Sequence, residues 1–203
     1  MLSLYSDRRL RELVEAKAVV RPHPTPIATL YETSPTSYEV SSSTVNIAYF
    51  GSFYPNRGIG GVLAAVGRLR ADVRRACRVH IFCNDPKGVA GPVAELGVAA
   101  NVYVNPYLNY LEFLNATRLF DVLLVNDVAR DENLPINPFL PSKYSDYRGS
   151  GQSIWALVDP GSPLDRASDI TYRTPLDIPE LIVEDLADIV LAELVRKSAA
   201  SGV

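Results

Sequence analysis

The sequence predicts a doubly wound α/β domain, in which helices cover both faces of a parallel sheet. From residue 45 onward, short apolar runs alternate with stretches in which apolar residues recur at helical spacing. Strands that alternate with helices imply right-handed crossovers and parallel pairing. Apolar residues make up 47% of the 203 residues, and charged residues 21%, which is enough apolar material for one large core.

The expected strands are apolar runs of ordinary strand length. The first, "VNIAYFG", ends in a glycine, and "FDVLLVND" has the continuous apolar pattern of a strand buried on both faces. The expected strands lie at residues 45–51, 78–83, 101–106, 120–127, 153–158 and 168–173.

The expected helices follow the strands one by one. The first, at residues 58–76, carries Val62, Leu63, Val66, Leu69 and Val73 at helical spacing. The segment "SKYSDYRGS" is a short helix that Gly149 and Gly151 bring to an end. The other expected helices lie at residues 88–96, 110–117 and 179–197.

The first 44 residues read as an appendage to this domain. Residues 3–17 predict a helix, residues 19–26 contain three prolines and must be extended, and residues 31–44 form a polar connector. We therefore divide the chain into residues 1–44, a domain at 45–178, and a C-terminal helix and tail at 179–203.

Composition excludes several classes of protein. The net charge of −3 argues against a nucleic-acid-binding protein, and no window has the ~20 apolar residues that span a bilayer. The charged start is unlike a secretory signal. Cys77 and Cys83 have no neighbouring ligand pair, so we expect buried thiols rather than a metal site or a disulfide. A cytoplasmic protein is expected.

In an open parallel sheet, ligands bind at the carboxyl ends of the strands, near the point where the strand order reverses. Three loops there could meet in one crevice: 51–58, the residues after 120–125, and the start of the "SKYSDYRGS" helix. Arg57 and Lys143 would supply cations for a diphosphate. The candidate binding residues are Gly51, Arg57, Gly58, Asn126, Asp127, Ser142, Lys143 and Asp146.

Each candidate also has a purely structural interpretation. Arg57 is then a solvated loop cation and Asp146 a solvent-facing acid. Lys143 is then an ordinary first residue of a helix, although a cation there opposes the helix dipole. His80 and Trp155 lie inside strands and are expected in the core, and no Ser-His-Asp arrangement is present to suggest a catalytic residue.

Taken in order, these segments resemble the donor-binding, C-terminal half of a family 4-like GT-B glycosyltransferase, which is a Rossmann-like domain. The resemblance covers residues 45–165 and rests on "NIAYFGSFYPNRGIGGVLAAV", "FDVLLVND" and "LPSKYSDYRGSGQSIWALVDPGSPL". It implies that Arg57 and Lys143 contact the diphosphate of a nucleotide sugar. Asp146 would stand at the second Glu of the family's Glu-x7-Glu motif, which holds the ribose.

Two departures from the family accompany the resemblance. Pro138 occupies the position of the first Glu of the motif, so the side chain that recognises the donor sugar in the family is absent, and the run "NPFLPSKYSDY" could replace it with backbone contacts. The resemblance also implies that the chain lacks the acceptor-binding half of GT-B enzymes, since residues 1–44 look like only its last helix and the linker. The isolated chain is therefore expected to bind a nucleotide sugar without transferring it, and to need a partner domain for the acceptor.

Three functions follow from this sequence. The resemblance implies metal-independent transfer of a sugar from a nucleotide diphosphate sugar to an acceptor hydroxyl, with no other cofactor. The alternative is a non-catalytic Rossmann-like module for binding or assembly that has lost this chemistry. A nucleotide-sugar epimerase is the third, but it would need a histidine in the cleft, and His80 is placed in a strand.

Overall fold

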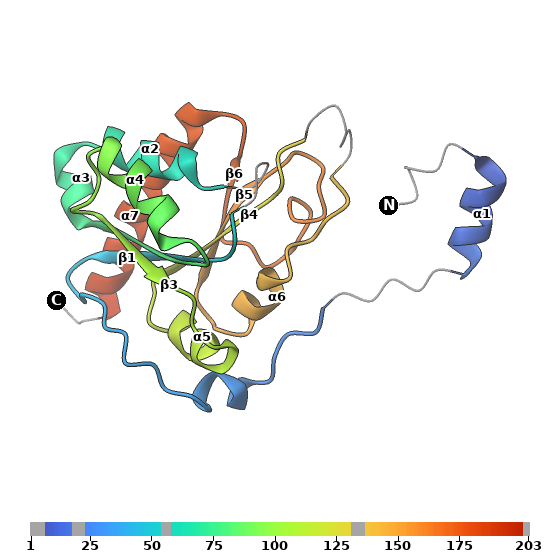
Figure 1. The fold of residues 1–203 in the computed structure, drawn as a ribbon, viewed down its shortest axis with the longest axis horizontal. Coiled ribbons are helices and arrows are strands. Elements are labelled where there is room, and N and C mark those ends of the chain that lie inside the picture. Colours follow the sequence, from blue (N-terminus) through green and yellow to red (C-terminus); the bar gives the residue numbers. More distant parts are fainter. Residues whose placement is uncertain (1–6, 18–22, 54–57, 131–136, 201–203) are drawn as a thin grey trace.

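A six-stranded sheet, parallel throughout, forms the centre of the molecule. The computed structural model describes residues 7–17, 23–53, 58–130 and 137–200. The strand order is β3-β2-β1-β4-β5-β6, so the order reverses between β1 and β4 (Figure 1). The strands are β1 (Val45–Phe50), β2 (Cys77–Cys83), β3 (Val102–Pro106), β4 (Val122–Asn126), β5 (Ser153–Val158) and β6 (Tyr172–Pro175).

Helices cover both faces of the sheet, because alternate strand residues point to opposite sides. In β1, Ile47 and Tyr49 pack on one side and Ala48 and Phe50 on the other. The first face is covered by α2 (Gly60–Arg68), α3 (Ala71–Ala76), α4 (Pro86–Glu95) and α7 (Pro179–Ala200). The second is covered by α5 (Tyr110–Thr117) and α6 (Lys143–Arg148). The predicted three-layer α/β fold is confirmed.

The main differences from the sequence prediction concern one helix and one strand. The helix expected at residues 58–76 is two helices, because Leu69 and Arg70 are extended, with ψ near 144° and 147°. Leu69 is nevertheless buried. Its apolar side chain therefore indicated a core position, but it did not indicate that the helix continues through this residue. The last strand begins at Tyr172 instead of residue 168, where pairing with Trp155 of β5 starts.

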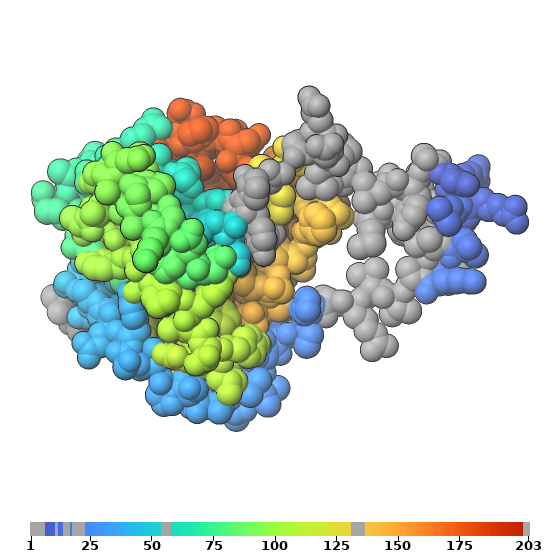
Figure 2. All heavy atoms as spheres, in the orientation of Figure 1, coloured from blue at the N-terminus to red at the C-terminus, as the bar shows by residue number. Residues whose placement is uncertain are grey.

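Residues 28–44, which we call the N-terminal strap, run across the α5 face of the domain. The strap starts with a short 3₁₀ helix, η2 (Ala28–Glu32), and in Figure 2 it covers the surface beside α5. Tyr31 is buried, and the Tyr38 ring lies 5.0 Å from that of Phe82. The connector expected from its polar composition is thus packed against the domain.

The remaining helix, α1 (Arg8–Lys17), lies within the helix expected at residues 3–17, of which residues 3–6 fall outside the described residues, and Leu10 and Leu13 on it are exposed. Among the described residues, no helix is long and apolar enough to cross a membrane.

The predicted core residues are buried. His80 and Trp155 are almost inaccessible, and the Trp155 indole donates a hydrogen bond to Thr174 Oγ1 at 2.9 Å. Cys77 and Cys83 are free thiols in the core, as expected.

Candidate functional site

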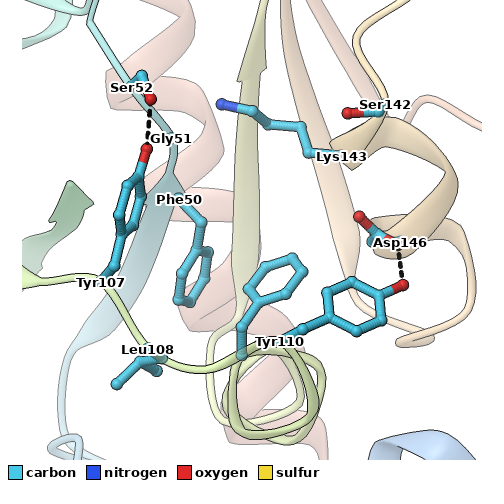
Figure 3. Close-up of a pocket in the computed structure, with 10 residues that line it drawn as sticks. Phe50, Gly51, Ser52, Tyr107, Leu108, Tyr110, Ser142, Lys143 and Asp146 are labelled. Carbon is cyan, nitrogen blue, oxygen red and sulfur yellow. Dashed lines mark hydrogen bonds between the residues drawn. The ribbon is translucent and has the colours of Figure 1, made fainter. Parts of the chain in front are cut away.

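A cavity of about 450 Å³ opens at the carboxyl end of β1, beside the point where the strand order reverses. Residues from three segments line it: the end of β1, the connection from β3 into α5, and α6 (Figure 3). The lining residues are Phe50, Gly51, Ser52, Tyr107, Leu108, Tyr110, Phe113, Ser142, Lys143 and Asp146. Four of the predicted site residues, Gly51, Ser142, Lys143 and Asp146, therefore lie around one space.

Lys143 reaches from α6 across the cavity toward the end of β1 (Figure 3). Its Nζ lies 4.0 Å from the centroid of the Tyr49 ring, a cation–π contact. Gly51 makes this approach possible, because a Cβ at residue 51 would collide with Lys143 Nζ. The glycine after the first strand thus leaves room for the lysine side chain.

Asp146 lies one turn after Lys143 on the same face of α6 and is half-buried. Its Oδ1 accepts a hydrogen bond from the Tyr110 hydroxyl at 2.9 Å. Burial raises the pKa of Asp146, and the Tyr110 hydrogen bond opposes the shift only in part. Burial and the neighbouring carboxylate raise the pKa of Tyr110 to about 12. The pair therefore offers a carboxylate oxygen and a neutral phenol side by side.

Aromatic side chains form the wall opposite α6, and the sequence prediction missed them. Tyr107, Tyr110 and Phe113 come from the segment after β3, and Tyr107 and Tyr110 are 47% and 54% exposed. The Tyr107 hydroxyl and Ser52 Oγ lie 2.5 Å apart. The signal was available, because these aromatics follow a strand and so stand at the same edge of the sheet as Gly51.

Three of the other predicted residues, Gly58, Asn126 and Asp127, do not line this cavity. Asn126 Nδ2 donates to the carbonyl oxygen of Gly58 at 3.0 Å, which joins the loops after β4 and β1. Gly58 lines a second cavity of about 390 Å³ between α2 and α4. Arg57 lies outside the described residues.

Asp127 is buried, and its carboxylate holds the loop that follows β5. Asp127 Oδ2 accepts hydrogen bonds from Asp159 N at 2.9 Å and Ser162 Oγ at 2.6 Å. Among the described residues, no group of three His, Cys, Asp or Glu side chains could hold a metal ion.

No protein-family model and no curated protein matches the sequence. Solved structures do match the fold. The C-terminal domain of a group 1 family glycosyltransferase from Francisella tularensis superposes with a TM-score of 0.56 at 11% identity, covering 85% of this chain and 90% of that domain. The chain has the fold of the C-terminal domain of GT-B glycosyltransferases.

Larger proteins contain a domain of the same fold. An α,α-trehalose-phosphate synthase (UDP-forming) from Burkholderia xenovorans matches with a TM-score of 0.62 at 13% identity, covering 88% of this chain and 45% of that one. A structure described as a UDP-N-acetylglucosamine 2-epimerase from Listeria monocytogenes matches with a TM-score of 0.54 at 13% identity, covering 93% and 50%. The present chain thus spans about half the length of these two proteins. One is described as a synthase and the other as an epimerase, so the fold alone does not identify the reaction.

Proposed function

We propose that this chain is the donor-binding half of a metal-independent glycosyltransferase and that the cavity at the β1 end holds a nucleotide diphosphate sugar. One observation carries the proposal: a lysine, a carboxylate and a set of aromatic rings from three separate segments line the same space at the switch point of the sheet. A cation, a hydrogen-bond acceptor and flat apolar surfaces are what a nucleotide diphosphate requires.

The diphosphate is assigned to the Gly51 and Lys143 side of the cavity. A glycine lets a phosphate approach the backbone, and the ammonium neutralises charge that develops on the departing diphosphate during sugar transfer. Arg57, which belongs to the loop after Gly51, is proposed as the second cation. Asn126 and Asp127 are also proposed to contact the donor, because they stand at the carboxyl end of β4.

The nucleoside is assigned to the other side of the cavity. The Asp146 carboxylate would accept a hydrogen bond from a ribose hydroxyl, in place of the one it now accepts from Tyr110. The rings of Tyr107 and Tyr110 offer surfaces on which a base can stack, worth about 1–3 kcal/mol per base. This geometry also accounts for an aromatic-rich wall at an exposed edge of the molecule.

Transfer to an acceptor is proposed to need a second domain, as in enzymes of which this fold forms about half. The isolated chain should bind a nucleoside diphosphate without turnover. Pro138 stands where the resemblance predicts a Glu. This replacement favours the alternative function, a non-catalytic module for binding or assembly. Supplying an acceptor-binding half in trans discriminates the two, because only a transferase would then release nucleoside diphosphate from a donor sugar.

Calorimetric titration with UDP and GDP tests the site. We expect Lys143→Ala to weaken binding of the preferred nucleotide about tenfold, through loss of a charge-assisted contact, and Arg57→Ala to weaken it similarly. Lys87→Ala, which removes an exposed lysine of α4 outside the cavity, is the matched control and should bind normally. Unchanged affinity in both Lys143→Ala and Arg57→Ala would reject the assignment.

A further inference from the structure

A third cavity lies at the amino-terminal ends of the strands, at the opposite end of the sheet from the candidate donor site. It has a volume of about 410 Å³ and is formed where α3 meets the starts of β2 and β3. Its lining residues are Leu69, Ala71, Arg74, Arg75, Arg78, Ala100 and Asn101. Because β2 runs seven residues from this end to the other, the two cavities are separated by about 20 Å.

Positive charge is concentrated around this cavity. Five of the 20 basic residues of the chain fall within residues 68–78, while the chain as a whole carries a net charge of −3. The only acid in that stretch, Asp72, forms an ion pair with Arg70 at 2.6 Å. The three lining arginines therefore create a local field opposite in sign to that of the whole molecule.

Neutral groups hold two of these guanidinium groups in place. Arg74 donates to Asn101 Oδ1 at 3.2 Å and to the carbonyl oxygen of Gly97 at 2.8 Å. Arg78 donates to the carbonyl oxygens of Arg75 and Cys77. Within the described residues, no carboxylate forms an ion pair with any of the three lining arginines. The side chains of Arg74 and Arg78 are thus oriented by neutral partners, and no described carboxylate compensates the charge of the three arginines.

We propose that this arginine cavity is a binding site for a phosphate group, carried either by a small soluble phosphate or by the headgroup of an anionic lipid. A guanidinium presents a planar fork of N–H donors that matches phosphate oxygens, and three of them around one cavity suit a phosphate group, whether a soluble dianion or the singly charged diester of a lipid headgroup. Prior orientation of Arg74 and Arg78 lowers the entropy lost on binding. The site is independent of the proposed nucleotide site, at the other end of the strands.

Arg75→Glu is the sharpest test, because Arg75 lies exposed on α3 and its side chain forms none of the hydrogen bonds that hold this region together. The matched control is Arg166→Glu, a charge reversal of another exposed arginine away from the cavity. The probes are inorganic phosphate and pyrophosphate in titration calorimetry. Co-sedimentation with vesicles of phosphatidylcholine alone, or mixed with phosphatidylglycerol, forms the lipid arm.

We expect the unaltered protein to bind in at least one arm, with affinity that falls as salt is raised, and Arg75→Glu to reduce that binding about tenfold. Binding in the calorimeter alone identifies a soluble phosphate, and binding to the mixed vesicles alone identifies a lipid headgroup. Arg166→Glu should bind as the unaltered protein does. Absence of binding in both arms, or equal binding by the two charge reversals, would overturn the proposal. UDP titration of Arg75→Glu should be unchanged, which separates this result from the test of the nucleotide site.

Discussion

At the scale of single residues, the contact between Lys143 and Gly51 determines the shape of the candidate site. The lysine ammonium lies against the Tyr49 ring and over the residue 51 backbone, where any side chain would meet it. Because Nζ is the far end of a flexible chain, it can move aside at little cost. A substitution at residue 51 should therefore affect the position of the charge more than the stability of the fold.

We predict that Gly51→Ala displaces the Lys143 ammonium and lowers affinity for the nucleoside diphosphate roughly two- to fivefold, the scale of one lost cation–π contact. Gly60→Ala is the matched control, because a Cβ at residue 60 meets nothing within 4 Å. Calorimetry measures both affinities, and thermal unfolding should show both variants folded. Full affinity in Gly51→Ala would mean that the lysine position does not matter for binding.

At the scale of elements, the N-terminal strap binds the two helices that supply the cavity. Tyr31 donates from its hydroxyl to the carbonyl oxygen of Asp146 at 2.5 Å, and Asn115 of α5 donates to the carbonyl oxygen of Tyr31 at 2.8 Å. The Tyr31 ring also lies against Gly149, at the end of α6. The strap thereby connects α5, which carries Tyr110, to α6, which carries Asp146.

We predict that Gly149→Ala destabilises the protein by about 1–3 kcal/mol, since its Cβ would lie 2.7 Å from Tyr31 Cζ in a well-packed interior. Gly91→Ala, within α4, places its Cβ at least 4 Å from every atom outside the adjoining residues and the helix backbone, and should change stability little, because the gain in helix propensity is opposed by Pro92, which disfavours helical conformation in a preceding residue with a Cβ. Denaturant unfolding measures the free energy of unfolding of both variants.

In the double variant Tyr31→Ala/Gly149→Ala, the loss of stability should be smaller than the sum of the losses in the two single variants. Additive losses would show that the ring is not what excludes the methyl group.

At the scale of the whole molecule, a buried histidine connects the strap to the sheet. His80 Nδ1 lies 2.8 Å from the Tyr38 hydroxyl, and Nε2 lies 3.2 Å from Asn46 Oδ1. Because the amide oxygen only accepts, Nε2 carries the proton and Nδ1 accepts from Tyr38. Burial lowers the pKa of His80 to about 4, with Arg78 adding to the shift.

The unfolded chain takes up a proton on His80 near pH 6.5, whereas the folded chain resists until about pH 4. Stability should therefore fall as pH drops through this window, by about 2 kcal/mol between pH 7 and pH 5. Denaturant unfolding at the two pH values measures the loss. His80→Gln should remove most of it, whereas His23→Gln, at the exposed second histidine, should retain it. An equal slope in His80→Gln and the unaltered protein would contradict the assignment.

Periodicity in the sequence was sufficient for most of the fold. Residues 153–158 and 110–117 form β5 and α5 with the predicted bounds, and His80 and Trp155 are buried where the strand pattern placed them. The break at Leu69 was not predictable in this way. An apolar residue at helical spacing indicates burial whether or not the backbone hydrogen bonds continue through it.

The order and spacing of its apolar residues determined that this chain forms a doubly wound sheet, and hence at which end of the strands the candidate site was sought, because alternation and helical spacing are local properties. The tertiary structure decided which side chains meet there. It brought Lys143 over Gly51, placed the aromatics after β3 beside Asp146, and turned Asp127 toward the loop after β5. These contacts join segments that are far apart in the chain. Their geometry depends on how the helices pack on the sheet, and the spacing of residues within one segment does not encode that packing.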